Sequence, residues 1–375
     1  MITLGFLGTG WIGRNRMEAM LATGEAKTVA ICDPSADMAH QAQELAPNAP
    51  LLSFEELLAC EPNGLVIATP SALHAEQCIR AFDAGIAVFC QKPLGRNAAE
   101  VEAVLAAAER ADRLLGVDLS YRHTAAMQAM RERVSNGDLG RIFAADLVFH
   151  NAYGPQSGWF WDRELSGGGC LIDLGVHLVD LALWLLDFPD VKSAQATLMR
   201  DGRMASPGEV EDYAVAELVL ETGAVVRLAC SWNLNAGRDA IIGASFFGTS
   251  AGAEMRNENG SFFDFSADLL RGRERERISS PPDEWGGRAA VTWLQSLKNG
   301  GGYAASTQGL LQSAHALDTL YASARRESIE QPAERTSRPG NGLVEAQDRS
   351  RPGEIQAAHM QSASNAEEWA APAGN

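Results

Sequence analysis

The sequence predicts an α/β protein of two domains, the first built on a doubly wound parallel sheet and the second on a large, mostly antiparallel open sheet. Its length of 375 residues favours two domains. Up to about residue 120, short apolar runs alternate with helix-length segments, which is typical of a parallel sheet. Strand-like runs without long helices between them follow from 191 to 268, which is typical of an antiparallel sheet. We divide the chain into domains at 1–120 and 121–327. The polar composition of the remaining segment, 328–375, predicts a flexible tail.

A glycine-rich motif connects the first predicted strand to the first predicted helix. Gly8-Thr9-Gly10-Trp11-Ile12-Gly13 follows the apolar run Ile2–Leu7 and precedes the helix-compatible segment Arg14–Thr23. Glycines in this pattern allow a tight turn and let the backbone approach a pyrophosphate, which the N–H groups of the helix N-terminus then bind. Asp33 ends the second apolar run, where a carboxylate accepts hydrogen bonds from ribose hydroxyls. The motif therefore predicts a bound dinucleotide. The expected contacts are Gly8, Gly10, Trp11, Ile12, Gly13 and Asp33.

The alternation of strands and helices continues to about residue 120. Right-handed crossovers in a parallel sheet bring the carboxyl ends of the strands to one edge, and ligands bind there. The further predicted helices are Glu55–Cys60, Ala72–Ala84 and Ala98–Ala111, and the further strands are Leu65–Ala68, Ile86–Cys90 and Leu114–Val117.

Two of these strand ends carry candidate site residues. Thr69 and Pro70 follow one strand, with His74 in the first turn of the next helix, and Gln91-Lys92-Pro93 closes the neighbouring strand. Pro93 favours an extended backbone at Lys92, which sets the direction in which the lysine leaves the sheet. We expect Lys92 to reach the ligand; the alternative is an ordinary solvated lysine at a strand end.

The character of the sequence changes after His123. A helix is predicted at Ala125–Val134 and a strand at Ile142–His150, and tight turns separate some of the later strands. Helices cover one face of such a sheet, and the open face often becomes a subunit interface. The later predicted strands are Val191–Met199, Tyr213–Leu220, Ala224–Trp232, Ile241–Phe247, Ala253–Arg256 and Phe262–Ala267, and the later helices are Trp285–Lys298 and Leu310–Arg325.

A second group of polar residues lies in the most apolar run of the chain, Cys170–Leu186, which follows three glycines, 167–169. Asp173, His177 and Asp180 are spaced so that they share one face of a buried helix. Unpaired buried polar groups cost roughly 1–3 kcal/mol each, so this face meets partners, water or a ligand. We predict site roles for Asp173 and His177 and a structural role for Asp180. Purely structural roles for all three are the alternative, and no third ligand is evident that would make a metal site.

The loop before these glycines holds Trp159, Trp161 and Arg163. Aromatic faces and a guanidinium suit a polyhydroxylated substrate, which offers C–H faces and hydroxyl edges. Trp161 and Arg163 are therefore candidate substrate contacts, with packing at the domain junction as the alternative.

Composition limits the partners and the compartment. The net charge of −17 argues against nucleic acid or an anionic membrane, because the field of the protein repels both. Six scattered cysteines without a Cys-x-x-Cys pair indicate a reduced, cytoplasmic chain with neither a zinc site nor disulfides. We also expect no signal peptide, since the first strand begins at the N-terminus, and no membrane span, since no apolar run is long enough.

Together these motifs resemble the glucose–fructose oxidoreductase / inositol dehydrogenase / rhizopine-catabolism (Gfo/Idh/MocA) family over residues 1–327. The resemblance rests on the glycine motif, Thr69-Pro70 with His74, Lys92-Pro93, Arg122, and the three glycines that lead to Asp173 and His177. It implies an N-terminal Rossmann domain and a second domain whose open sheet forms homodimers or homotetramers. It also implies NAD(P)-dependent oxidoreduction of sugars, inositol-like polyols or related cyclic compounds. Two residues depart from the family pattern, since Gln91 stands where Glu is usual and Ser71 where Asn is frequent.

The resemblance also implies roles for individual residues. Lys92 would be the catalytic lysine, with Asp173 and His177 as its partners, and we expect these groups to handle the proton and the alkoxide during hydride transfer at a C–OH or C=O carbon. The further expected cofactor contacts are Thr69, Pro70, His74, Gln91, Lys92 and Arg122, and the expected substrate contacts are Lys92, Arg122, Trp161, Arg163, Asp173 and His177.

Asp33 favours NAD over NADP, because Pro34 and Ser35 beside it supply no arginine for a 2′-phosphate. NADP stays possible. Two other functions also stay open: an NAD-dependent glycosidase of the same fold and a non-catalytic NAD-sensing regulator.

Overall fold

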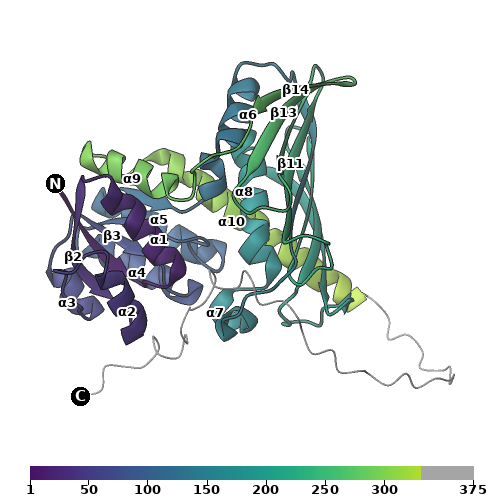
Figure 1. Cartoon of the computed structure of the whole chain (residues 1–375). Coiled ribbons are helices and arrows are strands. Elements are labelled where there is room, and N and C mark those ends of the chain that lie inside the picture. Colours follow the sequence, from purple (N-terminus) through teal and green to yellow (C-terminus); the bar gives the residue numbers. More distant parts are fainter. Residues whose placement is uncertain (331–375) are drawn as a thin grey trace.

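A computed structural model describes residues 1–330 of the chain, in which a parallel sheet with its helices lies beside a larger sheet (Figure 1). The segment predicted as a flexible tail, 328–375, lies outside the described residues apart from 328–330, which belong to the last helix. The two sheets confirm the fold class predicted from the sequence.

The first sheet has five parallel strands in the order β2-β1-β3-β4-β5, as the alternation of strands and helices predicts. Its strands are β1 (Ile2–Leu7), β2 (Ala26–Cys32), β3 (Gly64–Ile67), β4 (Ala87–Cys90) and β5 (Leu115–Val117). The helices that alternate with them are α1 (Trp11–Ala22), α2 (Ala36–Gln43), α3 (Phe54–Ala59), α4 (Ser71–Asp83) and α5 (Ala98–Ala111). The ends of β1, β3 and β4 therefore bring the glycine turn, Thr69 and Lys92 to one edge.

A helix from the far end of the described chain completes this domain. α9 (Arg288–Lys298) packs against α1, β4 and β5, and the ring of Trp293 lies 5.7 Å from that of Phe89. Gly64 and Gly116 make room for the indole, because a Cβ at either position would lie 2.5 Å from it. Residues in the segment assigned to the second domain thus cover one face of the first sheet.

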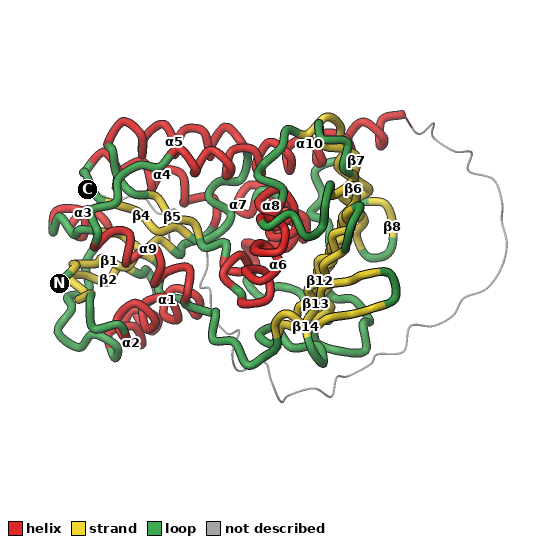
Figure 2. Tube along the Cα trace, turned by 90° about the horizontal axis from the view of Figure 1, so that it is seen from above, coloured by secondary structure: helices red, strands yellow, loops and turns green. Residues whose placement is uncertain are grey.

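The second sheet has nine strands in the order β14-β13-β12-β11-β6-β10-β9-β7-β8, and all neighbours are antiparallel except β6 and β10. Its strands are β6 (Ile142–Asn151), β7 (Val191–Arg200), β8 (Arg203–Met204), β9 (Tyr213–Leu220), β10 (Val225–Ser231), β11 (Ala240–Gly248), β12 (Gly252–Asn257), β13 (Phe265–Arg271) and β14 (Glu274–Ser279). The remaining helices are α6 (Ala125–Ser135), α7 (Arg163–Ser166), α8 (Val176–Leu185) and α10 (Gln308–Glu330). Figure 2 shows α6 and α8 between this sheet and the first domain.

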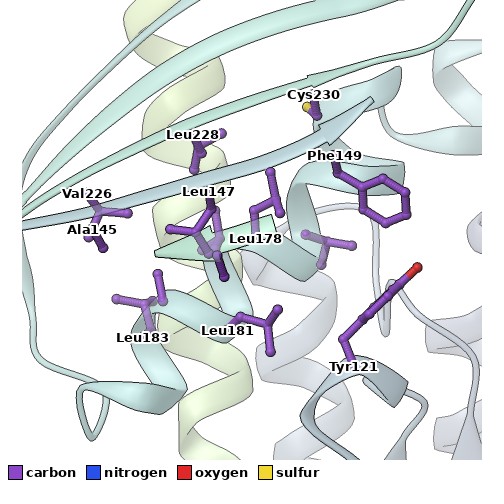
Figure 3. Close-up of a cluster of buried hydrophobic side chains, with 14 of the residues drawn as sticks. Tyr121, Ala145, Leu147, Phe149, Leu178, Leu181, Leu183, Val226, Leu228 and Cys230 are labelled. Atoms are coloured by element: carbon purple, nitrogen blue, oxygen red, sulfur yellow. The ribbon is translucent and has the colours of Figure 1, made fainter. Parts of the chain in front are cut away.

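The inner face of the second sheet packs on α8. Leu147 and Phe149 of β6 and Leu228 of β10 are buried with Leu178 and Leu181 of α8 in one apolar cluster (Figure 3). Within residues 1–330, one helical stretch, Arg163–Leu185, is apolar and long enough to cross a membrane by length and composition alone, and 89% of its most apolar 18-residue window is buried inside the protein. The sequence prediction of a buried helix here is confirmed.

Several element boundaries differ from the predictions. α1 begins at Trp11 rather than at Arg14, because Gly10 already serves as its N-cap. The strand expected from Phe262 is β13 and begins three residues later, after a turn. α2 is half polar and β14 has a single apolar residue, so the apolar pattern does not predict them. The start of the predicted helix at Cys170–Leu186 is a π-helical turn, Leu171–Gly175.

Candidate active site

The glycine motif forms the turn between β1 and α1 that its pattern predicts. Gly8 has φ +82°, and a Cβ there would lie 2.6 Å from the backbone of Ala68. A Cβ on Gly13 would overlap the carbonyl oxygen of Gly8. α1 starts directly after Gly10 without a side-chain cap, so its first backbone N–H groups can bind an anion. This cradle fits the pyrophosphate of a dinucleotide.

Asp33 lies beside this turn at the end of β2. One carboxylate oxygen accepts hydrogen bonds from the backbone N–H of Thr9 at 2.6 Å and from its hydroxyl at 3.1 Å, and the other accepts from the backbone N–H of Ser35 at 2.9 Å. Burial raises the pKa of Asp33, while these hydrogen bonds act in the opposite direction. Trp11 and Ile12 are the half-buried first residues of α1. Contact of these residues with a dinucleotide stays a prediction.

Lys92 and Asp173 form an ion pair between the two domains. The Lys92 ammonium donates to a carboxylate oxygen of Asp173 at 2.6 Å and to its backbone carbonyl at 2.8 Å. The side chains are 19% and 17% exposed, so the pair is accessible to a small molecule. Lys92 follows β4, and Asp173 lies in the π-helical turn before α8, a feature that is frequent at functional sites.

Trp232 orients the carboxylate and has no counterpart among the predicted site residues. Its indole N–H donates to the second Asp173 oxygen at 3.1 Å, so Asp173 is held from both sides. Trp161 packs edge-on against Trp232 with ring centroids 5.0 Å apart, and the Arg200 guanidinium lies 4.3 Å over the Trp161 ring. Of the predicted loop residues, Trp161 therefore belongs to the wall beside Asp173.

His177 is buried near this ion pair. Its ring lies edge-on to Tyr121 at 4.8 Å between centroids, and within residues 1–330 its nitrogens make no hydrogen bond. Burial lowers the pKa of His177 well below its ordinary value, and the nearby Lys92 charge lowers it further. The imidazole is therefore neutral at pH 7 and can accept a proton. In the described part of the chain, no group of three or more His, Cys, Asp or Glu side chains is placed to hold a metal ion.

His74 and Gln91 brace the strand ends. The two ring nitrogens of His74 each lie 2.7 Å from a carbonyl oxygen, one of Thr69 and one of Pro93, so this residue bridges the ends of β3 and β4. Pro70 caps α4, and the Thr69 hydroxyl donates to Gln77 at 2.6 Å. Gln91 donates its amide N–H to the buried Asp118. These residues hold the backbone around Lys92, and their contact with a cofactor stays a prediction.

Two predicted arginines form contacts of their own outside the Lys92–Asp173 ion pair. Arg122 pairs with the buried Asp180, with its Nε 2.7 Å from a carboxylate oxygen, which agrees with a structural role for Asp180. Arg163 lies 5.2 Å over the ring of Tyr321 in α10, where it lines a separate hollow against β7. Neither guanidinium forms an ion pair or hydrogen bond with Lys92, Asp173 or His177 within residues 1–330.

Glu211 fixes the start of the helix that carries Asp173, and local sequence patterns do not identify it. It is fully buried, and one oxygen accepts from the backbone N–H groups of Gly169 and Leu171 at 3.0 Å each and from the Tyr321 hydroxyl at 2.7 Å. Burial raises the pKa of Glu211. Its signal in the sequence is weak, because it is one of three acidic residues in the loop before β9, with Glu209 and Asp212.

Comparison with known proteins identifies the class. Residues 2–119 match the model of the oxidoreductase family with an NAD-binding Rossmann fold, and residues 127–254 match the GFO/IDH/MocA C-terminal domain. The chain therefore belongs to the Gfo/Idh/MocA family and is an NAD(P)-dependent oxidoreductase.

Named relatives agree with the family, and solved structures agree with the fold. The chain is 31% identical over 245 residues to a D-glucoside 3-dehydrogenase of Escherichia coli K12, which covers 62% of this chain and 70% of that protein. Its fold matches levoglucosan dehydrogenase in complex with NADH, with a TM-score of 0.74 at 22% identity over 87% of this chain and 98% of that one. It also matches a 3-ketoreductase from Actinomadura kijaniata in complex with NADP, with a TM-score of 0.74 at 20% identity over 86% and 97%.

Proposed function

We propose that this oxidoreductase transfers a hydride between NAD(P) and a C–OH or C=O carbon of a sugar, an inositol-like polyol or a related cyclic compound. The observation that carries the proposal is the Lys92–Asp173 ion pair, which lies at the carboxyl end of the parallel sheet with the neutral His177 nearby. The substrate class is supported by the names of the relatives, among them a D-glucoside 3-dehydrogenase.

Each residue has a distinct role in this proposal. His177 accepts the hydroxyl proton, since its neutral imidazole is a base at neutral pH. The Lys92 ammonium donates a hydrogen bond to the reacting oxygen and stabilises the negative charge that develops there. Asp173, held by Trp232, orients the ammonium. NAD(P), when bound at the glycine turn, supplies the hydride chemistry.

NAD is the cofactor that we propose, with NADP as the alternative. Asp33 lies beside the glycine turn, where its carboxylate can accept hydrogen bonds from the ribose hydroxyls. A 2′-phosphate at the same place would meet the negative charge of this half-buried carboxylate.

Absorbance of NADH or NADPH during incubation with sugars, inositols and sugar acids tests the proposal. We expect turnover with one compound class, and we expect Lys92→Met to abolish it while calorimetry still detects NAD binding. Lys192→Met, at an exposed position of β7, is the control and keeps full activity. Normal turnover of Lys92→Met would remove the lysine from the mechanism. No turnover by the unchanged protein, with NAD still bound, would favour the glycosidase or the sensor.

The proposal also includes assembly into a homodimer or homotetramer in the cytoplasm. Within residues 1–330, α6 and α8 cover one face of the nine-stranded sheet and α10 passes its β7 edge, so most of the opposite face has no helix on it (Figure 2). All six cysteines are free thiols, which suits a reducing compartment. The net charge of −17 disfavours nucleic acid or an anionic membrane as a further partner.

A further inference from the structure

A buried carboxylate at the end of β5 collects side chains from separate parts of the first domain. Asp118 is 1% exposed and accepts hydrogen bonds from Arg16 Nε at 2.6 Å, from the Ser120 hydroxyl at 2.8 Å and from the Gln91 amide. Arg16 is buried as well and also donates to the Ser120 hydroxyl at 3.3 Å. These four side chains form one hydrogen-bonded group with a single negative and a single positive charge.

The Asp118 group connects the parts of the proposed site. Arg16 lies in α1, whose N-terminus forms the dinucleotide-binding turn, and Gln91 directly precedes Lys92. Ser120 begins the 3-10 turn Ser120–His123, which contains Tyr121, the residue that packs on the His177 ring. A displacement of Asp118 would therefore move the cofactor turn, the lysine and the neighbour of the histidine.

Gln91 is the neutral member of this group. Its amide N–H meets a carboxylate oxygen that already accepts from Arg16, and its backbone N–H donates to the Ile67 carbonyl at 2.8 Å. A glutamate here, the residue usual in the family, would place a second carboxylate against Asp118 with one guanidinium for both. Two buried carboxylates in contact cannot both stay ionised without a large cost, so one would take up a proton or move away.

We propose that Gln91 is a positioning residue for Lys92 that is matched, in this chain, to the Asp118–Arg16 ion pair. The amide ties the end of β4 to Asp118, so that Lys92 leaves the strand toward Asp173. The role of Lys92 in catalysis rests on the proposed function, whereas the pairing of Gln91 with Asp118 does not depend on it.

Three variants of the full chain test this pairing: Gln91→Glu, Asp118→Asn and the double variant, which again contains one carboxylate and one amide facing Arg16. Gln308→Glu, at an exposed position in α10, is the control for the same change of charge. The first readout is kcat and KM as a function of pH. The second is the carbon-13 chemical shift of the Lys92 side chain, which is resolvable because the chain has only four lysines.

We expect Gln91→Glu to lose about tenfold or more in kcat as the pH rises from about 6 to about 9, because the introduced carboxyl group ionises against Asp118. At the lower pH the protonated group donates to Asp118 as the amide does, so kcat approaches that of the unchanged protein. The Lys92 resonance shifts in Gln91→Glu and returns in the double variant, which recovers most of the lost activity. The other charged or titratable groups near Asp118 are Arg16, Cys90 and His123, and Lys92 follows Gln91 in the chain. All four are common to the variants, so their effects cancel in the comparison.

A Gln91→Glu protein with the pH profile and the Lys92 resonance of the unchanged protein would overturn the proposal. A double variant that is no more active than the product of the single losses would do the same. If Gln91→Glu does not fold, the double variant alone tests the proposal, through the pH dependence of its kcat and KM and the chemical shift of its Lys92. Absence of hydride transfer by the unchanged protein would refute the proposed function. The pairing of Gln91 with Asp118 would still be tested, because the Lys92 resonance reports on it without any turnover.

Discussion

His177 is kept uncharged by its surroundings, and this sets the pH range in which it can accept a proton. Burial is the larger cause of its lowered pKa, and the Lys92 charge is the second. A neutral base is therefore retained as the pH falls below 6.5, the ordinary histidine value. We expect kcat/KM to hold on acidification until well below pH 6.5, where an exposed histidine would already be protonated.

Replacement of Lys92 separates the effect of burial from the effect of the Lys92 charge on the pKa of His177. In Lys92→Met, NMR titration should give His177 a higher pKa than in the unchanged protein, still below 6.5 because the burial remains. His177 also affects the stability of the fold. Its pKa in the folded protein lies below its value in the unfolded chain. The stability that the neutral imidazole contributes is therefore complete above pH 6.5 and is lost as the pH falls toward the folded pKa. A His177 pKa at or above 6.5 in the unchanged protein would contradict the assignment.

At the residue scale, the sequence locates side chains whose position follows from the topology. Lys92 could be predicted because strands of a parallel sheet end at one edge, and Asp173 because a polar group in an apolar helix needs a partner. Trp232 and Glu211 could not, since each contacts residues at least 40 positions away and neither stands in a local pattern. Arg163 has the right chemistry for a substrate, but the structure places it on Tyr321.

At the scale of elements, the junction between the three glycines and the π-helical turn is the most constrained point of the site. A Cβ on Gly169 would overlap the backbone carbonyl of Glu211, which also accepts the Cys170 N–H at 3.0 Å. We expect Gly169→Ala to lower the free energy of unfolding by about 2–3 kcal/mol, because backbone on both sides has to move. It should also lower kcat, since the turn carries Asp173.

Urea denaturation compares this variant with Gly286→Ala, whose added methyl group meets no atom within 4 Å. The control should stay within about 0.5 kcal/mol of the unchanged protein. Equal stability of the two variants would show that the contact between Gly169 and Glu211 is not the constraint.

Helices and strands with a regular apolar pattern could be predicted from the sequence. A charged edge strand and a turn held by contacts with distant residues could not. α5 begins at Ala98 and ends at Ala111, as its alanine-rich pattern predicts, and β9 keeps both predicted ends. β14 alternates charged residues because it is an edge strand, and therefore lacks the apolar signal. The π-helical turn depends on contacts with Glu211 and Tyr321, which are distant in sequence.

At the scale of the whole molecule, the two domains share elements. α10 packs on α5 with its first half and on β7 and α8 with its second, and α9 covers the first sheet although it follows the second. The order of apolar runs predicts the two sheets. It does not predict that helices late in the chain pack on the first domain, because the sequence of an amphipathic helix does not indicate which sheet its apolar face will contact. The ion pair of Lys92 with Asp173 lies across the same junction.

The outer face of the second sheet carries a row of apolar residues on which the proposed oligomer contact can form. Val215, Ala229 and Val148 are aligned across β9, β10 and β6 by the strand register, and Val215 is 44% exposed. Beside this apolar row, Arg227 pairs with Asp146 on the same face. An apolar row with an ion pair beside it suits a symmetric contact between two copies, and such a contact buries about 800 Å² of each partner.

We expect Val215→Arg to dissociate the protein into monomers of 40.1 kDa, because two arginines would meet across the symmetry axis in an apolar contact. Light scattering measures the mass. Leu45→Arg places the same charge at a residue of the first domain that is 38% exposed, and the oligomer should persist. If the unchanged protein has the mass of one chain, or if Val215→Arg keeps the larger mass, the sheet face is not the interface. Dissociation with unchanged turnover would further show that each subunit holds a complete site, as expected since Lys92, Asp173 and His177 come from one chain.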